Sequence, residues 1–74
     1  MFLEQAPIKI ELCLEDVSDT TLQVKLLEMG FSIGSKIQLI RRAPFNGPYT
    51  IGNHKSQVIL RKEDARLISV SKLN

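Results

Sequence analysis

The first part of the chain alternates apolar and polar residues with a period of two. The apolar positions are Ile8, Ile10, Leu12 and Leu14, and the intervening ones are Lys9, Glu11 and Cys13. Successive side chains of a strand point to opposite faces, so this pattern predicts a half-buried strand over residues 8–14 with the four aliphatic side chains facing the core. We predict a polar connector over residues 15–19.

The pattern then changes to a helical period. Residues 20–23, Thr-Thr-Leu-Gln, have the spacing of a capping box, in which a threonine hydroxyl accepts from the backbone one turn later. One apolar stripe follows at i, i+4 and i+7, formed by Leu22, Leu26 and Met29. Gly30 stands where a left-handed residue ends a helix, and Phe31 is placed to close the hydrophobic contact beyond it.

The rest of the chain is a series of short extended runs separated by turn signals. We predict strands over residues 36–43, 49–51, 58–61 and 67–70, and a single helical turn over 62–65. Asn46-Gly47, between Pro44 and Pro48, is the strongest turn signal, and residues 52–55 form a second one. The fold class is therefore mainly β: a small barrel of about five strands, closed to remove exposed edges, with one short helix inserted between strands 1 and 2.

Length and composition indicate one small intracellular domain. The 74 residues, 43% of them hydrophobic, are predicted to form a single domain over 1–74. The single cysteine excludes an intramolecular disulfide and the multi-cysteine zinc motifs, which favours a reducing compartment. We expect no signal peptide or membrane insertion, because no long apolar run is present, and hence a cytoplasmic location.

Charge is distributed unevenly along the chain. Residues 1–28 carry six acidic and two basic side chains, a net of −4, whereas residues 29–74 carry two acidic and eight basic ones, a net of +6. The total of +2 therefore hides an asymmetry, and we expect one acidic and one basic surface that could orient a partner.

The residues that could carry chemistry form no recognisable catalytic set. His54, the single histidine, lies in a predicted turn beside Lys55, which disfavours a cation site. Cys13 is interpreted as a small hydrophobe or semi-exposed thiol on the first strand. No phosphate-binding loop or nucleophile–base pair is present, so we expect no enzyme, no catalytic residues, no metal site built by one chain and no cofactor.

Two basic pairs leave nucleic-acid binding open as an alternative. Arg41-Arg42 and Arg61-Lys62 could line a basic groove, and Phe45 and Tyr49 flank the predicted Asn46-Gly47 turn as candidate stacking surfaces. The low net charge and the lack of an RNA-binding signature weigh against it, and nucleic acid is not the expected partner.

Several motifs, taken together, resemble the FeoA family of ferrous iron transport protein A domains. They are Leu26-Leu27-Glu28-Met29-Gly30-Phe31-Ser32-Ile33-Gly34, then Arg41-Arg42-Ala43-Pro44-Phe45-Asn46-Gly47-Pro48, then Leu60-Arg61-Lys62-Glu63-Asp64-Ala65, and Ile68-Ser69-Val70. The resemblance covers residues 22–70 at similar spacing. The chain departs from the family pattern in its first strand, which lacks glycine, and at Lys55, where glycine is common.

The resemblance implies an SH3-like β-barrel with an inserted helix and a cytosolic accessory role in bacterial ferrous iron uptake. The implied partner is the membrane transporter FeoB, which carries a cytosolic G-protein domain. The chain is also similar to the C-terminal module of iron-dependent repressors, so a metal-responsive regulatory module is a further alternative. Self-association stays open.

The hairpin around Asn46-Gly47 is the candidate docking surface. Its predicted partner-binding residues are Arg41, Arg42, Pro44, Phe45, Pro48 and Tyr49. Aromatic and arginine side chains dominate interface energies, and two prolines stiffen the loop so that less entropy is lost on binding. The alternative is that the hairpin is only a turn whose prolines block edge pairing.

Overall fold

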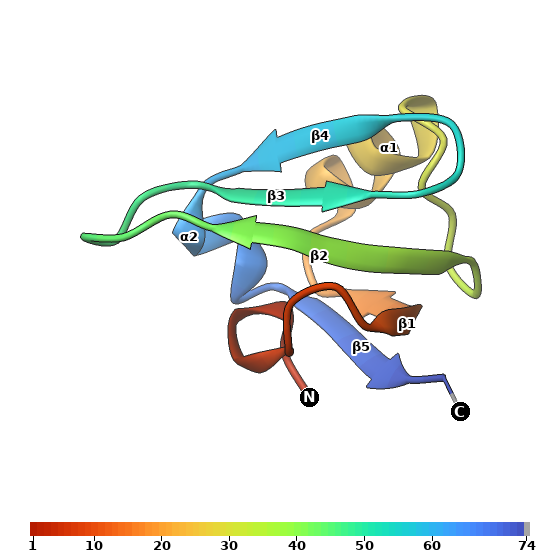
Figure 1. Ribbon diagram of the computed structural model, residues 1–74. Helices are drawn as coiled ribbons and strands as arrows, with labels where there is room; N and C mark the ends of the chain where they lie inside the picture. Colours follow the sequence, from red (N-terminus) through yellow and green to blue (C-terminus); the bar gives the residue numbers. More distant parts are fainter. Residues whose placement is uncertain (74) are drawn as a thin grey trace.

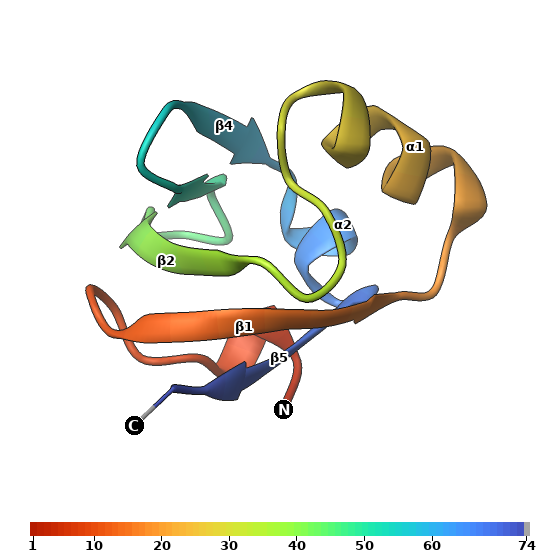
Figure 2. The same ribbon diagram turned by 90° about the vertical axis from the view of Figure 1, so that its right-hand side faces the viewer.

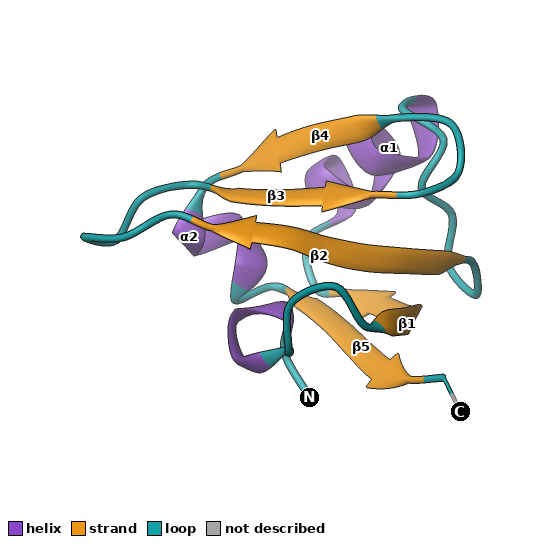
Figure 3. Cartoon of the chain, in the orientation of Figure 1, coloured by secondary structure: helices purple, strands orange, loops and turns teal. Residues whose placement is uncertain are grey.

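The computed structural model describes residues 1–73, which form five strands and three short helical segments (Figure 1). In chain order these are η1 (Leu3–Gln5), β1 (Glu11–Val17), α1 (Thr20–Glu28), β2 (Lys36–Arg42), β3 (Tyr49–Gly52), β4 (Gln57–Leu60), α2 (Lys62–Ala65) and β5 (Ile68–Lys72). Figure 3 shows the strands and helices by colour. The predicted class, mainly β with five strands and a helix between the first two, is confirmed. No described helix has the length and apolar character that crossing a bilayer requires.

All five strands belong to one antiparallel sheet in the order β4-β3-β2-β1-β5. The sheet bends, so that β1 and β5 lie below β2 and β4 in Figure 2, with α1 and α2 beside them. The predicted closure into a complete barrel is wrong, because β4 and β5 are the two edges and no ladder within residues 1–73 joins them. Sixteen side chains fill the bend, among them Leu14, Leu26, Phe31 and Ile51.

The first strand lies later in the chain than predicted. Lys9 has a left-handed φ of +63°, which reverses the chain, and both Ile8 and Ile10 remain 41% exposed. The stretch predicted as a polar connector instead continues β1 to Val17 and pairs with β5, past a bulge between Leu14 and Asp16. Ile8 forms only an isolated bridge to Leu39 of β2. The alternation therefore predicts burial correctly at Leu12 and Leu14, which are fully buried, but not at Ile8 and Ile10.

Helix α1 begins one residue earlier and ends as predicted. Its N-cap is Asp19, whose carboxylate accepts from the Thr21 amide at 2.9 Å, so the predicted threonine capping box is wrong. At the C-terminus Gly30 has φ +93°, and the amides of Phe31 and Gly30 donate to the Leu26 and Leu27 carbonyls at 2.8 and 3.0 Å. This is the Schellman arrangement that leaves Phe31 in the core.

The buried stripe of α1 is shorter than predicted. Leu22 and Leu26 are buried, whereas Met29 is 42% exposed at the end of the helix. The nearby β3–β4 turn instead contacts the carbonyl groups of this end: Nδ2 of Asn53 donates to the Gly30 carbonyl at 3.0 Å, and Oγ of Ser56 donates to the Met29 carbonyl at 3.3 Å. These bonds satisfy carbonyls that the helix leaves free and hold the turn against α1.

The N-terminal segment, for which the sequence predicted no structure, is part of the core. Leu3, the first residue of η1, is fully buried, and Ala6, which follows η1, is 1% exposed. The short η1 packs against β5 and α2. Phe2 forms an isolated antiparallel bridge to Ser69 of β5. The segment therefore covers the end of the bent sheet beneath the β2–β3 hairpin (Figure 1).

Candidate functional site

The tip of the β2–β3 hairpin displays one aromatic side chain to solvent. The Gly47 amide donates to the Pro44 carbonyl at 3.1 Å, which closes a four-residue turn with Phe45 and Asn46 at its centre. Both central residues are left-handed, with φ of +59° and +60°, as a type I′ turn requires. Phe45 is 98% exposed, so a large apolar ring stands free at the tip.

This turn differs in its details from the one that the sequence predicted. Asn46-Gly47 was expected at the centre, but the centre is Phe45-Asn46, and Gly47 closes the turn without a left-handed φ. Glycine is needed at position 47 for space: a Cβ there would lie 2.8 Å from the Ala43 Cβ and 2.9 Å from the Pro44 carbonyl oxygen. The left-handed conformation therefore falls on a phenylalanine, for which it is unfavourable.

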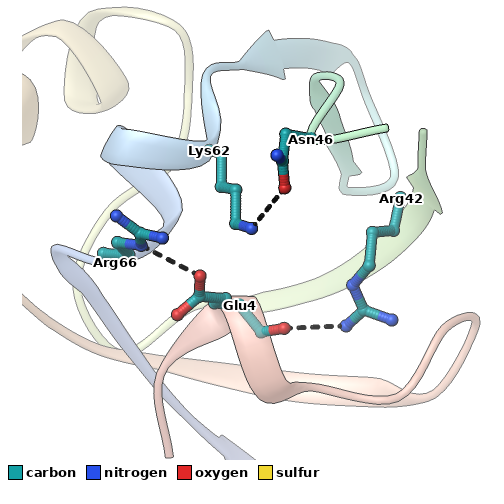
Figure 4. Close-up of polar contacts among 5 residues, drawn as sticks. All are labelled: Glu4, Arg42, Asn46, Lys62 and Arg66. Atoms are coloured by element: carbon teal, nitrogen blue, oxygen red, sulfur yellow. Dashed lines mark hydrogen bonds and ion pairs between the residues drawn. The ribbon is translucent and has the colours of Figure 1, made fainter. Parts of the chain in front are cut away.

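Helix α2 supports the turn from one side. Nζ of Lys62 donates to Oδ1 of Asn46 at 2.7 Å (Figure 4). The helix itself begins where the Asp64 carboxylate accepts from the Arg61 amide at 3.2 Å. Because Asn46 neighbours Phe45, this contact limits the movement of the residue that carries the exposed ring.

The base of the hairpin is fastened to the N-terminal segment by Arg42. Its Nη2 donates to the carbonyl of Glu4 at 3.0 Å (Figure 4). The same Nη2 donates to the carbonyl of Ala6 at 2.6 Å, and the guanidinium lies 5.5 Å from the centre of the Tyr49 ring. Its Nε is enclosed and donates to no acceptor among residues 1–73. The cost of burying this unpaired donor offsets part of the stabilisation from the two Nη2 hydrogen bonds. Arg66 of the α2–β5 connection also reaches this segment, 3.0 Å from the Glu4 carboxylate.

The six predicted partner-binding residues thus fall into two groups. Arg41, Pro44, Phe45 and Pro48 are exposed on the hairpin. Tyr49 is 3% exposed and belongs to the core, and Arg42 donates hydrogen bonds from Nη2 to carbonyls of the N-terminal segment. The expectation that Tyr49 and Arg42 are displayed beside Phe45 is therefore wrong. Register explains it, because residues 42 and 49 are paired across the first rung of the hairpin and their side chains share a face.

Sequence reasoning missed Lys62 and Asn46 as a contact between α2 and the hairpin. They are 16 residues apart, and only the folding of β4 back along β3 brings α2 beside the turn. It also missed Glu4, which pairs with Arg66. That pair and the Glu11–Lys36 pair, at 3.5 Å, join the acidic N-terminal part of the chain to the basic remainder. The acidic and basic surfaces are therefore less separated than expected.

A second concave surface lies at the opposite end of β2. This groove has a volume of about 690 Å³, and its polar lining includes Lys36, Gln38 and His54. The Glu11–Lys36 ion pair stands beside it. The polar side chains of its lining can form hydrogen bonds, and within residues 1–73 no nucleophile of the lining is hydrogen-bonded to a basic side chain.

The remaining chemically reactive side chains are dispersed. His54 is exposed in the β3–β4 turn, and Cys13 is half-buried on β1. Desolvation, and secondarily the neighbouring Glu15 carboxylate, raises the pKa of the Cys13 thiol, which favours its unreactive protonated form. Within residues 1–73 no three His, Cys, Asp or Glu side chains lie together in a way that could hold a metal ion.

Comparison with solved structures places the fold among FeoA proteins. The FeoA protein of Chlorobium tepidum is 21% identical over 100% of this chain and 71% of its own, with a TM-score of 0.89. Iron(II) transport protein A of Clostridium thermocellum is 27% identical over 99% of this chain and 46% of its own, with a TM-score of 0.84. The structure of ScaR with bound Zn²⁺ is 24% identical, covering 99% of this chain and 37% of that protein, with a TM-score of 0.85.

No curated protein matches the chain. The model of the FeoA domain family matches residues 1–72, nearly the whole chain. The SH3-like fold, the Schellman glycine and the proline-flanked hairpin fall within that match. The chain belongs to the FeoA domain family.

Proposed function

We propose that this FeoA domain is a non-enzymatic, cytoplasmic accessory of ferrous iron uptake that docks onto the transporter FeoB at its cytosolic G-protein domain. The observation that carries the proposal is the Phe45 ring, 98% exposed at the tip of a braced hairpin. Binding of a partner over an exposed aromatic ring removes apolar surface from water, which favours the complex. Interface energies concentrate in such side chains.

Rigidity of the hairpin supports this role. The tip is closed by the Pro44–Gly47 hydrogen bond, and Lys62 holds Asn46 from α2. A loop that is ordered before binding loses less conformational entropy on docking. Arg41, exposed on β2 next to the hairpin, adds positive charge that can steer an acidic partner surface and speed association.

The test is binding of the purified domain to the isolated cytosolic domain of FeoB. Phe45→Ala should weaken binding by about 2 kcal/mol, roughly thirtyfold, while the melting temperature stays within a degree or two. Leu27→Ala is the matched control, since Leu27 is also apolar and is 58% exposed, but on α1. Unchanged affinity of a normally folded Phe45→Ala protein would remove the hairpin from the interface, and no binding by the parent protein would refute the function itself.

A metal-responsive regulatory module is a second candidate, and the likeness to ScaR with bound Zn²⁺ favours it. Anaerobic calorimetry with Fe²⁺ separates the two. A stoichiometric site of micromolar affinity that is lost in His54→Ala or Cys13→Ser would support metal sensing, and GTP turnover by the domain alone would contradict the non-enzymatic role.

A further inference from the structure

The two edges of the sheet are treated differently. The outer side of β5 is partly covered by the N-terminal segment, since the Val70 amide donates to the Met1 carbonyl at 2.7 Å and Phe2 bridges to Ser69. Strand β4 pairs with β3 alone, and among residues 1–73 no other segment is paired with its outer side. One edge of the sheet is therefore open for pairing.

The register identifies which backbone groups of β4 point outward. The Asn53 amide donates to the Ser56 carbonyl at 3.0 Å, and hydrogen-bonded pairs alternate along an antiparallel ladder. Val58 opposite Ile51 and Leu60 opposite Tyr49 are then the bonded pairs. The amide and carbonyl of Gln57 and of Ile59 consequently face away from β3, and Ile59 also carries a side chain that is 70% exposed.

The devices that usually block a free edge are missing from β4 itself. Gln57–Leu60 contains no proline and no charged residue, and its four pairs with β3 run without a bulge. The flanks are charged instead: Lys55 precedes β4, and Arg61 and Lys62 follow it directly, before the acidic Glu63 and Asp64 of α2. Two copies of this edge would bring basic flanks together in either the parallel or the antiparallel orientation, so the charges oppose self-pairing.

The same charges attract an acidic strand. We propose that the open edge of β4 binds an extended, acidic segment of another protein, which adds to the sheet as a sixth strand beyond β4. Backbone bonds to Gln57 and Ile59 supply the pairing, the Ile59 side chain contacts an apolar residue of the added strand, and Lys55 and Arg61 pair with carboxylates at its ends. This surface is separate from the hairpin and does not depend on its role.

The probe is a synthetic peptide of alternating valine and threonine with aspartates at both ends, compared with the same peptide ended by lysines. Amide exchange followed by NMR reports on the edge directly. The aspartate peptide should slow exchange of the Gln57 and Ile59 amides about tenfold at a concentration about nine times its Kd. The lysine peptide should bind at least about tenfold more weakly.

Three variants separate the contributions. Ile59→Pro removes an outward amide that β3 does not use, so the fold should survive and peptide binding should be lost. Ile59→Thr keeps that amide and should retain binding with a reduction of about threefold. The double variant Lys55→Glu/Arg61→Glu should reverse the preference between the two peptides, which keeps the test valid even where proline lowers the melting temperature.

Several outcomes would overturn the proposal. Equal affinity for the two peptides would remove the charge argument. Protection that appears without peptide and grows with protein concentration would identify a second copy of this chain as the occupant. Exchange that is unchanged at Gln57 and Ile59 while other amides respond would place the peptide elsewhere on the domain.

Discussion

Lys62 and Asn46 join α2 to the tip of the hairpin through a hydrogen bond of 2.7 Å between Nζ and the side-chain oxygen. Lys62→Ala should therefore loosen the turn without unfolding the domain. We expect faster exchange of the Gly47 amide, and binding to FeoB weaker by about 0.5–1 kcal/mol, since an exposed polar contact contributes at that scale. Lys25→Ala, an exposed lysine on α1, is the control. Identical Gly47 exchange in both variants would mean that the contact does not restrain the turn.

Phe45 stands in a left-handed conformation with φ +59° although its ring makes almost no contact with the rest of the domain. Asparagine tolerates this conformation better, so Phe45→Asn should raise the free energy of unfolding by about 0.5–1 kcal/mol while partner binding falls. Urea unfolding and binding are measured on the same sample. A loss of stability would show that the ring contributes to the fold.

The neighbouring arginines should behave differently. Arg42→Ala removes two hydrogen bonds from a guanidinium to the carbonyls of Glu4 and Ala6 and should cost about 1–3 kcal/mol of stability. Arg41→Ala, on the exposed side of the same strand, should change stability by less than about 0.5 kcal/mol and act mainly on the rate and salt dependence of partner binding. Equal melting temperatures for the two variants would contradict the role of Arg42 in fastening the N-terminal segment.

Leu26 is 1% exposed at the centre of the packed face of α1, whereas the adjacent Leu27 is 58% exposed. Leu26→Ala should lower the free energy of unfolding by about 2–5 kcal/mol, enough to unfold much of a domain of this size. Leu27→Ala should be nearly neutral, because it leaves no cavity. The pair is compared by chemical denaturation, and similar midpoints would show that the helix faces the other way.

Cys13 should react slowly with thiol reagents at neutral pH. Desolvation, with a smaller effect of Glu15, raises its pKa above that of an unperturbed cysteine, so the reactive thiolate forms only at higher pH. Because the folded pKa is raised, any contribution to stability is complete below the unfolded pKa and is lost as pH rises through the folded one. The pH profile of alkylation should have its midpoint above that of the unfolded protein in urea, and Glu15→Gln should move it part of the way down. A midpoint at or below that of the unfolded protein would contradict the assignment.

The elements that the sequence predicted well are those whose signals are local. The Gly30 stop with Phe31 behind it, the alternation of β2 around Ile37 and Leu39, and the turn of α2 each depend on contacts within a few residues, so their patterns are legible in one segment. The family motifs lie largely in these segments. The core role of Leu26 and the exposure of Phe45 followed from the same local logic.

Tertiary structure decided the rest. The alternation at Ile8 and Ile10 looks like a strand, but the segment forms only an isolated bridge from Ile8 to Leu39 of β2. The chain turns at Lys9 before β1 begins, and both side chains stay exposed. The sheet order decided that β4 keeps a free edge where a closed barrel was predicted. Pairing across the hairpin placed Arg42 and Tyr49 on the inner face and left Arg41 outside. Such outcomes depend on which distant segments come into contact, as Arg42 and Glu4 do although they are 38 residues apart. A local sequence pattern does not specify contacts between segments so far apart in the chain.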